Sequence, residues 1–455
     1  MSGFKINHTP IDKLLLDKRM EEIEKETPEE IDVSQFKPIS SPELIKILGL
    51  TIKRDDENKL ITFLAMLSAY TDSSQLNISF NAPSSSGKSY IPTEIAMLFP
   101  KEDVKEVGYC SPTAFFHDKA EKYNKETNEL IVNLSHKIII FLDQPHTLLL
   151  QHLRPILSHD KTEVTLKITD KSQRAGLRTK NVVLKGFPSV IFCTAGLRID
   201  EQESTRFLLL SPEVNQKKIR EAIKEKISRA VNNVFYNQQL EENTNRQLLK
   251  KRIMAIKQAG IKDIQINNHK RIEVLFYERV KILKPRHQRD IGRIISLIKI
   301  FALINLWFRE KVNSSIIATN DDIKQAFDLW DSISEAQELN LPPFVYNLYK
   351  EVIIAGYEDK NKIIVTGPKG LTRQDILTKH FSVYGRHLPD YQLRKEILPM
   401  LATAGLIFQE VDKEDRRIIL IYPTTLSTIS SASNNSGVDG GVTYDEIDKQ
   451  LGIES

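Results

Sequence analysis

Hydrophobic and polar positions alternate with two different periods in the first half of the chain. Between residues 77 and 195, the short apolar runs NISFN, KIIIFLD and SVIFCTA alternate with helical patterns. Short apolar runs bounded by turn residues are typical of buried strands, and their alternation with helices is typical of a mostly parallel sheet. The pattern therefore predicts an α/β fold, with a three-layer α/β core over residues 73–211.

Helical patterns dominate on both sides of this core. Residues 1–72 are predicted to form a charged helical region, because DKRMEEIEKETPEEID is mostly charged and the segment before residue 72 has helical periodicity. Residues 212–338 contain three longer amphipathic patterns, including NQKKIREAIKEKISRAVNNVF and RDIGRIISLIKIFALINLWFREKV. We therefore expect a helical domain over residues 212–338.

The order of elements changes after Pro342 and Pro343. Two helical patterns, TRQDILTKHF and PDYQLRKEILPMLATAGLI, precede two strand patterns, IFQEVD and RRIILIYP. Two helices followed by a β-ribbon are typical of an α+β winged-helix domain, which we place at residues 340–425. Residues 426–455 begin with a Ser-, Asn- and Gly-rich run and are predicted to be a flexible tail.

Composition narrows the class of protein. The 455 residues are 40% hydrophobic and 27% charged, with a net charge of +4, so any nucleic-acid surface must be local. Two cysteines without metal-ligand spacing suit a reducing compartment, and we expect a cytoplasmic protein. No apolar run reaches the roughly 18 residues of a membrane helix, so no membrane partner is expected.

The segment APSSSGKSY lies between a predicted strand and a predicted helix, as a phosphate-binding loop does. Gly87 lets the backbone approach phosphates, Lys88 would contact the β- and γ-phosphates of ATP, and Ser89 would bind Mg²⁺. The alternative is a Ser-rich loop that matches by chance, and Ala82 stands where the pattern has glycine. The predicted nucleotide-binding residues are Ala82, Pro83, Ser84, Ser85, Ser86, Gly87, Lys88, Ser89 and Tyr90.

Three further residues extend the predicted site. Asp143 ends the run IIIFLD and is the predicted second Mg²⁺ ligand, although a strand-terminal Asp also forms turns. Thr194 ends a third predicted strand, where its hydroxyl could contact the γ-phosphate. The alternative is a purely structural role for this hydroxyl. Arg206 precedes an apolar run and either forms a local ion pair or reaches the γ-phosphate in a neighbouring subunit.

Basic residues gather in EVTLKITDKSQRAGLRTKNVVLKG, which predicts a β-hairpin near residues 163–186. We predict that Lys171, Arg174, Arg178 and Lys180 contact DNA phosphates, with strongly salt-dependent binding. The alternative is a solvated hairpin without a partner. In the winged helix, basic residues are candidates for duplex DNA contacts or for protein docking: Arg394, Lys395, Arg416 and Arg417.

This order of motifs resembles AAA+ ATPases of the pre-sensor-1 hairpin clade, and most closely the minichromosome-maintenance-like helicases of mobile genetic elements and phages. The resemblance rests on APSSSGKS, IIIFLDQ, the hairpin, IFCTA, STRF and RDIGRIISLI. It implies a hexameric ring that hydrolyses ATP with Mg²⁺ between subunits and draws single-stranded DNA through its pore. It also implies that residues 212–338 form a lid, from which Arg289 contacts the nucleotide.

Gln144 departs from the family pattern, which has a catalytic glutamate after the aspartate. Loss of a general base typically lowers the rate ~10²–10⁴-fold. Three interpretations remain: natural loss of hydrolysis, a base elsewhere, or a deliberate Glu-to-Gln change that keeps ATP bound. We favour the third, because the rest of the apparatus is present.

Three functions compete at this stage. The first is an ATP-dependent DNA helicase for replication of a mobile element. The second is an ATP-switched DNA-binding scaffold or helicase loader that does not unwind DNA. A transcriptional activator of the same clade is disfavoured, because no GAFTGA-like loop is present.

Overall fold

The computed structural model describes residues 31–108, 110, 122–124, 129–170, 178–196, 205–261, 263–280, 282–362 and 369–424. The chain divides into two compact units, Met1–Lys37 and Pro38–Ser455. The described part of the first unit holds one short helix, η1 (Val33–Gln35), whose preceding residue Asp32 accepts a hydrogen bond from the Ser34 N–H. Most of the predicted charged helical region, residues 1–30, lies outside the described residues. All further elements belong to the second unit.

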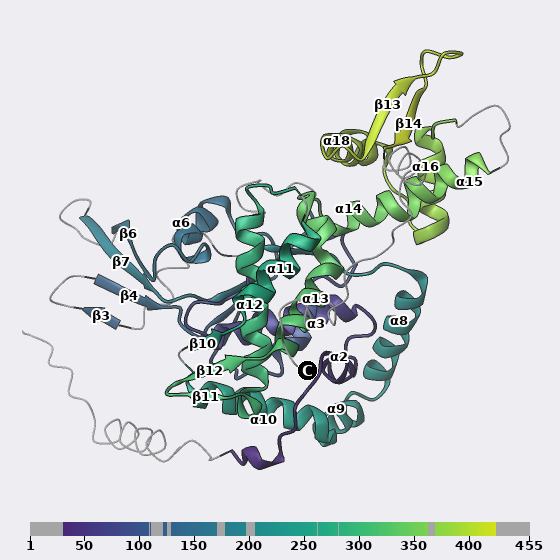
Figure 1. Ribbon diagram of the computed structural model, residues 1–455. Helices are drawn as coiled ribbons and strands as arrows, with labels where there is room; N and C mark the ends of the chain where they lie inside the picture. The colour runs from purple at the N-terminus through teal and green to yellow at the C-terminus, as the bar shows by residue number, and fades with distance from the viewer. Residues whose placement is uncertain are drawn as a thin grey trace, which may run out of the picture. The chain divides into compact units, whose positions relative to one another are not determined.

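A parallel five-stranded sheet forms the centre of the second unit (Figure 1). Every neighbouring pair in it is parallel. The prediction of an α/β fold with a parallel sheet is therefore confirmed. The strands lie in the order β2 (Val104–Val107), β5 (Ile138–Phe141), β8 (Ser189–Thr194), β1 (Ile78–Asn81) and β9 (Leu208–Leu210).

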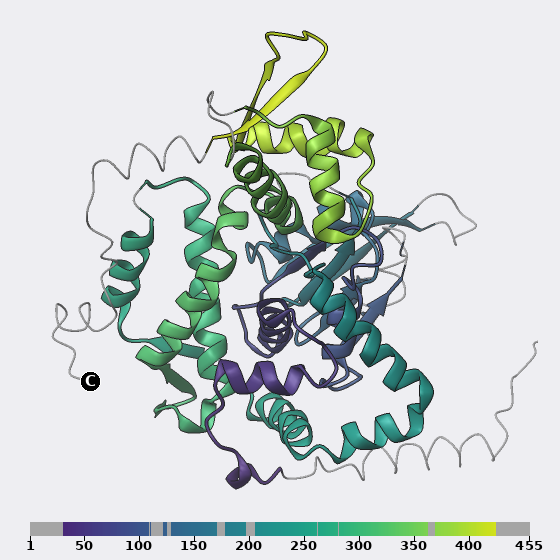
Figure 2. The same cartoon turned by 90° about the vertical axis from the view of Figure 1, so that its right-hand side faces the viewer.

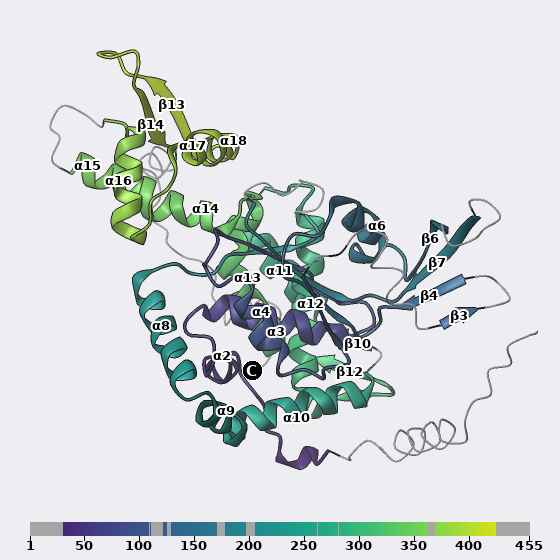
Figure 3. The ribbon, with the colours of Figure 1, turned by 180° about the vertical axis from the view of Figure 1, so that it is seen from behind.

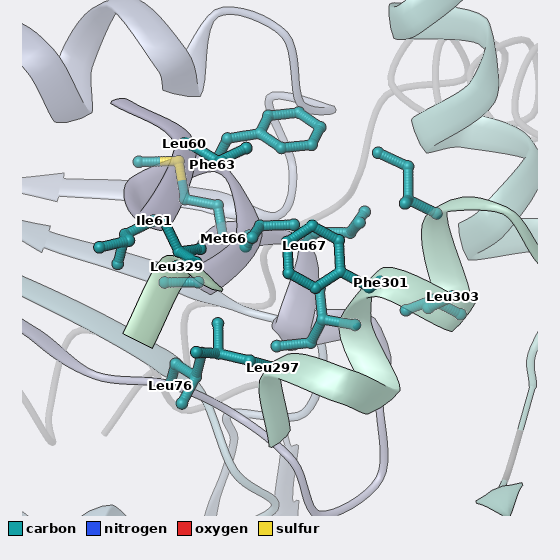
Figure 4. Close-up of a cluster of buried hydrophobic side chains, with 14 of the residues drawn as sticks. Leu60, Ile61, Phe63, Met66, Leu67, Leu76, Leu297, Phe301, Leu303 and Leu329 are labelled. Carbon is teal, nitrogen blue, oxygen red and sulfur yellow. The ribbon is translucent and has the colours of Figure 1, made fainter. Parts of the chain in front are cut away.

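Helices cover both faces of this sheet. Successive strand residues point to opposite sides, and β5 is buried at every position, so apolar side chains on both faces need a covering layer. Ile138 and Ile140 of β5 belong to a large core with helices α3 (Asp56–Leu67), α12 (His287–Ile304) and α13 (Asn320–Glu338). Ile139 and Phe141 of the same strand pack instead with α6 (Thr147–Leu157). Figure 4 shows the first core, where Leu67 of α3 lies near Phe301 of α12. The arrangement is compatible with three layers.

The boundary predicted at residue 72 needs a correction. Helices α2 (Ser41–Leu48) and α3, with the 3-10 turn η2 (Ser68–Tyr70), contribute Leu44, Leu64 and Tyr70 to the same core as β1. Residues 38–72 therefore fold with the sheet and do not form a separate N-terminal region. Burial of an apolar helix face binds these segments together, and sequence periodicity alone does not show which partner a helix buries against.

The predicted hairpin is present and is part of a larger sheet. Strands β6 (Glu163–Asp170) and β7 (Arg178–Lys185) pair antiparallel, with Asp170 opposite Arg178. Strand β4 (Glu129–Asn133) pairs parallel to β7, and β3 (Lys122–Asn124) pairs antiparallel to β4. This four-stranded sheet extends outward beside α6 (Figures 1 and 3). The sequence pattern did not predict β3 or β4.

Residues 212–338 are mainly helical, as predicted, with helices α8 (Gln216–Val231), α9 (Asn233–Glu242), α10 (Thr244–Ala259), α11 (His269–Arg279), α12 and α13, and a 3-10 turn η3 (Leu306–Phe308). The first three follow one another along the periphery, drawn in teal in Figure 2. The structure adds a small sheet, β10 (Asp263–Ile266), β12 (Ser315–Ala318) and β11 (Lys311–Val312). These strands are too short for a clear period-two pattern.

Residues 343–423 form helices and a β-ribbon with a separate hydrophobic core that includes Val345, Ile376, Leu393 and Ile421. The first helical run comprises α14 (Pro343–Leu348), a π-helical turn η4 (Tyr349–Ile354) and α15 (Ala355–Asn361). After it come α16 (Arg373–Tyr384), then α17 (Asp390–Gln392), a π-helical turn η5 (Leu393–Ile397) and α18 (Leu398–Thr403). Strands β13 (Ile407–Val411) and β14 (Ile419–Pro423) pair antiparallel. The predicted tail, residues 426–455, lies outside the described residues.

Candidate nucleotide-binding site

The predicted phosphate-binding loop follows β1 directly and leads into α4 (Tyr90–Ala96). Its start is fixed by the buried Ala82, whose N–H donates to the Thr194 carbonyl at 3.2 Å. Two loop residues have positive φ, Ser85 (64°) and Gly87 (88°). Left-handed residues within a tight loop make backbone N–H groups converge on a concave surface, the usual setting for a bound anion. The Tyr90 N–H then donates to the Gly87 carbonyl at 3.1 Å and starts the helix.

A buried hydroxyl in this loop lacks a hydrogen-bond partner among the described residues. The Ser86 hydroxyl is shielded from solvent and has no partner within the described part of the chain. A buried hydroxyl without a partner costs about 1–3 kcal/mol. A phosphate oxygen would supply the missing partner, so the Ser86 hydroxyl fits a loop that holds phosphate.

A cavity of about 1170 Å³ opens beside the loop. Pro83–Gly87 form one wall, and Thr51, Ile52 and Tyr90 form another, with the Tyr90 hydroxyl donating to the Thr51 carbonyl at 3.0 Å. Helices α8 and α16 supply further residues, among them Ile219 and Ile223. The volume and mixed lining suit a nucleotide. Sequence reasoning missed Thr51, Ile52 and the α8 residues, because no motif marks an apolar wall.

Three predicted site residues meet at the carboxyl ends of the strands. Strand β8 lies between β1 and β5, so Thr194 is placed between the loop and Asp143. The Thr194 hydroxyl donates to Gln144 Oε1 at 2.9 Å, and the Gln144 N–H donates to Asp143 Oδ1 at 2.8 Å. Thr194 is buried, whereas Asp143 and Gln144 are exposed. The structure therefore brings Asp143, Gln144 and Thr194 together.

Lys88 and Asp143 both affect the pKa of the buried Cys193 thiol. Burial raises the pKa of Cys193 to about 12; the Lys88 ammonium acts against this rise and the Asp143 carboxylate adds to it. The Cys193 thiol also donates to the Lys88 carbonyl at 3.4 Å. Electrostatic influence of this kind requires proximity, so Lys88 and Asp143 both lie near Cys193 of β8. Neither side chain lines the cavity.

Ser89 is the last residue before α4, where its carbonyl accepts the Thr93 hydroxyl at 2.9 Å. Within the described residues, no three His, Cys, Asp or Glu side chains come close enough to hold a metal ion by themselves. A Mg²⁺ ion held by Ser89 and Asp143 would need phosphate oxygens as further ligands, which is the usual arrangement for this ion.

Arg206 and Arg289 lie together, and neither lines the cavity. The Arg206 side chain donates to the Ser158 hydroxyl at 2.6 Å, and Arg289 donates to the hydroxyl of Thr205, the residue before Arg206. Arg206 precedes β9, which runs parallel to β1, so it lies at the amino ends of the strands. The loop lies at their carboxyl ends. The structure therefore does not bring Arg289 to the phosphate loop of its own chain.

The other two arginines of this helix have internal partners. Arg293 is buried, bonds Asp290 at 2.9 Å and donates to the Thr205 and Phe207 carbonyls at 2.7 and 3.1 Å. Its burial lowers the pKa of its guanidinium to about 10. Arg286 also bonds Asp290, at 3.2 Å. Arg293 therefore fastens α12 to the segment before β9, and Arg286 bonds Asn340 and Gln337 near the end of α13. The exposed Arg289 is left as the candidate for a ligand contact.

Two of the predicted DNA-contacting residues, Lys171 and Arg174, lie outside the described residues. Arg178 and Lys180 occupy β7, opposite Asp170 and Ile168 of β6. They stand two positions apart on that strand.

No protein-family model matches the sequence, and no curated protein sequence matches it. In the described part of the chain, no helix is both long and apolar enough to cross a membrane.

Proposed function

We propose that this chain is an ATP-dependent DNA helicase of the AAA+ class, assembled as a ring and serving replication of a mobile genetic element. The observation that carries the proposal is the meeting of the loop, Asp143, Gln144 and Thr194 at the carboxyl ends of three neighbouring strands. A phosphate-binding loop next to a strand-terminal carboxylate is the arrangement that nucleotide hydrolysis with Mg²⁺ needs. The helical segment 212–338 would be the lid, and residues 343–423 a winged helix.

Each residue has a distinct role in this proposal. The backbone of Ser84–Gly87 and the Ser86 hydroxyl hold phosphate oxygens, and Lys88 neutralises their charge. Ser89 and Asp143 bind Mg²⁺, which supplies charge stabilisation to the transferring phosphoryl group. Thr194 orients the side chain at position 144 through its 2.9 Å hydrogen bond. A carboxylate at that position would be held to accept a proton from water.

The two arginines beside Thr205 support a site shared between subunits. The register between β1 and β9 pairs Ile78 with Leu208, which places Arg206 about seven residues before the loop, or roughly 20 Å along the strands. An arginine side chain cannot span that distance within one chain. We therefore propose that Arg206 and Arg289 act on the nucleotide of a neighbouring subunit, where they stabilise charge on the γ-phosphate.

An apolar stripe on α8 also supports self-association. Ile219, Ile223, Ile227 and Val231 recur every four residues and are 38%, 54%, 57% and 79% exposed, so they share one face of the helix. The stripe begins in the wall of the nucleotide cavity, because Ile219 and Ile223 line it. We propose that a second copy of this chain covers the stripe. Contiguous exposed apolar surface of this kind marks interaction sites.

The DNA contacts rest on the hairpin. We propose that the tip between β6 and β7, with Lys171, Arg174, Arg178 and Lys180, contacts single-stranded DNA in the pore of the ring. Neutralising phosphates releases counterions, so this binding should weaken steeply as salt is raised. The winged helix is the second candidate surface, for duplex DNA.

Gln144 favours a second candidate function, an ATP-switched scaffold or helicase loader that binds DNA without unwinding it. Its side-chain amide accepts the Thr194 hydroxyl but has no carboxylate to take a proton. A chain of this kind would bind ATP, assemble and keep its nucleotide intact.

The two functions are separated by the full chain and its Gln144→Glu variant, with Gln144→Ala as the control. Glutamate keeps an acceptor for the Thr194 hydroxyl, so phosphate release should rise ~10²–10⁴-fold with single-stranded DNA present, whereas alanine should stay inactive. Strand displacement on a forked duplex by the glutamate variant supports the helicase. Hydrolysis without displacement supports the scaffold. No hydrolysis by any of the three chains would contradict the helicase.

A further inference from the structure

The turn between α16 and α17 is held by several local contacts. Gly385 ends α16 with φ +65°, and its N–H donates to the Phe381 carbonyl at 2.8 Å. The His380 Nδ1–H donates to the Arg386 carbonyl at 3.0 Å, and the His387 ring stacks on Phe381 at 4.6 Å between centroids. The backbone on both sides of Arg386 is therefore fixed, which limits where its side chain can go.

This turn faces the nucleotide cavity. Tyr384, Gly385, Arg386 and His387 all line it, together with the phosphate loop. Gln216, at the start of α8, donates to the Tyr384 carbonyl at 3.2 Å, and Arg386 Nη1 donates to the Ser84 carbonyl at 3.4 Å. A guanidinium from the C-terminal helices thus lies at hydrogen-bond distance from the backbone of the loop predicted to hold phosphates.

Within the described part of the chain, Arg386 differs from the other cations of the lining in its hydrogen bond to the predicted phosphate-binding loop. Three of the others are paired with carboxylates, Lys53 with Glu225, Lys218 with Asp55 and Arg229 with Glu94, and Lys226 lies on α8. The loop partner of Arg386 is a carbonyl, which leaves its positive charge uncompensated by that contact. A guanidinium presents five N–H donors in a planar fork, so it can keep a carbonyl and still bind a phosphate oxygen.

We propose that Arg386 is a phosphate-binding residue for the nucleotide in the loop of its own chain. Lys88 approaches the phosphates from the side of β8, and Arg386 approaches them from the cavity. Bound triphosphate would then hold the α16–α17 turn against the loop, so the C-terminal helices respond to the state of the nucleotide. This inference rests on the proposed function, because it requires that the loop bind ATP.

The test is calorimetric titration of the full chain with ATP, ADP and AMP in the presence of Mg²⁺. In Arg386→Ala, the Kd for ATP should rise about tenfold or more, because hydrogen bonds to charged groups are worth roughly this much. The Kd for AMP should change little, so the preference for ATP over AMP shrinks. Arg386→Lys keeps the positive charge but not the planar guanidinium, so its Kd for ATP should lie between those of the unchanged chain and Arg386→Ala.

The control is Lys251→Ala, which removes one positive charge from an exposed position of α10 outside the cavity. It should bind all three nucleotides as the unchanged chain does. Unchanged ATP affinity in Arg386→Ala would overturn the proposal, and so would an equal loss for ATP and AMP, which would indicate a purely structural role. Failure of the unchanged chain itself to bind ATP would instead overturn the nucleotide site, and this inference with it.

Discussion

Gln144 and Thr194 are separated by 50 positions in the chain, yet one hydrogen bond of 2.9 Å joins their side chains. Each residue was identified in the sequence for a separate reason. Gln144 follows Asp143 where the family pattern has a glutamate, and Thr194 ends a predicted strand. Parallel strands bring their carboxyl ends to one edge of a sheet, so strand-terminal polar residues could be predicted to meet there. The hydrogen bond itself could not be predicted, because it depends on side-chain rotamers that leave no sequence signal.

His159 gives a prediction for stability at the scale of one residue. Burial lowers the pKa of its imidazole, while Asp160 acts in the opposite direction. Nε2–H donates to Gln75 Oε1 at 3.2 Å, and the ring meets Phe187 edge-on at 4.7 Å. The folded chain therefore keeps His159 neutral in a range where the unfolded chain protonates it. The stability that the neutral His159 contributes is fully present above the pKa of His159 in the unfolded chain, about 6.5. It is lost as the pH drops through the pKa of His159 in the folded chain.

The measurement is the melting temperature between pH 7.5 and 5.5 for the unchanged chain and for His159→Gln. The variant should be less stable at pH 7.5, because it loses the ring contact, but its melting temperature should decline less steeply with acid. Some decline should remain, since burial also lowers the pKa of His380. The same change at exposed His269 is the control. Parallel curves for His159→Gln and the unchanged chain would show that His159 does not cause the pH dependence.

Helix α8 carries the element-scale prediction. Ile227 is 57% exposed and lies outside the nucleotide cavity, so Ile227→Glu alters the apolar stripe without touching the lining. A charge in the middle of an interface is strongly unfavourable unless it is paired. We expect the mass of the chain in solution with ATP to fall towards that of a monomer, while ATP affinity and melting temperature change little.

Ser228→Glu is the matched control, because it adds the same charge to an exposed neighbour off the stripe. It should assemble as the unchanged chain does. If Ile227→Glu and Ser228→Glu assemble equally, the stripe is not the contact between copies. If both dissociate, the added charge rather than the lost apolar contact is responsible.

Elements differed in how well the sequence predicted them. The strands β1, β5 and β8 are fully buried apolar runs, and such runs are the clearest strand signal. Strand β4 was missed because ELIVN follows a polar, charged stretch and is buried at only two of its five positions, Leu130 and Val132. Strands β10, β11 and β12 have two to four residues each, and β10 pairs with β12 across about 50 residues of chain, so tertiary packing decides this sheet.

At the scale of the whole molecule, the candidate site is divided between two ends of one sheet. The loop, Asp143, Gln144 and Thr194 lie at the carboxyl ends of the strands, and Arg206 with Arg289 lies at the amino ends. Sequence motifs identified most members of both groups, but their separation became evident only from the strand register. In the shared site that we propose, a complete site requires two copies, with the arginine end of one against the loop end of the next.

Mixing subunits tests this arrangement. In the hydrolysing Gln144→Glu background, chains that also carry Arg206→Ala should bind ATP with normal affinity, because Arg206 is remote from their own loop. Added to fully active chains at increasing ratios, they should lower phosphate release more steeply than dilution, since each defective arginine silences a neighbour's site. Arg289→Ala should behave in the same way, because Arg289 bonds Thr205 beside Arg206. Lys350→Ala, which removes an exposed surface cation paired with Glu335, is the control and should leave release unchanged at every ratio. A strictly linear fall with the fraction of Arg206→Ala chains would mean that each chain completes its own site, and the shared site would have to be abandoned.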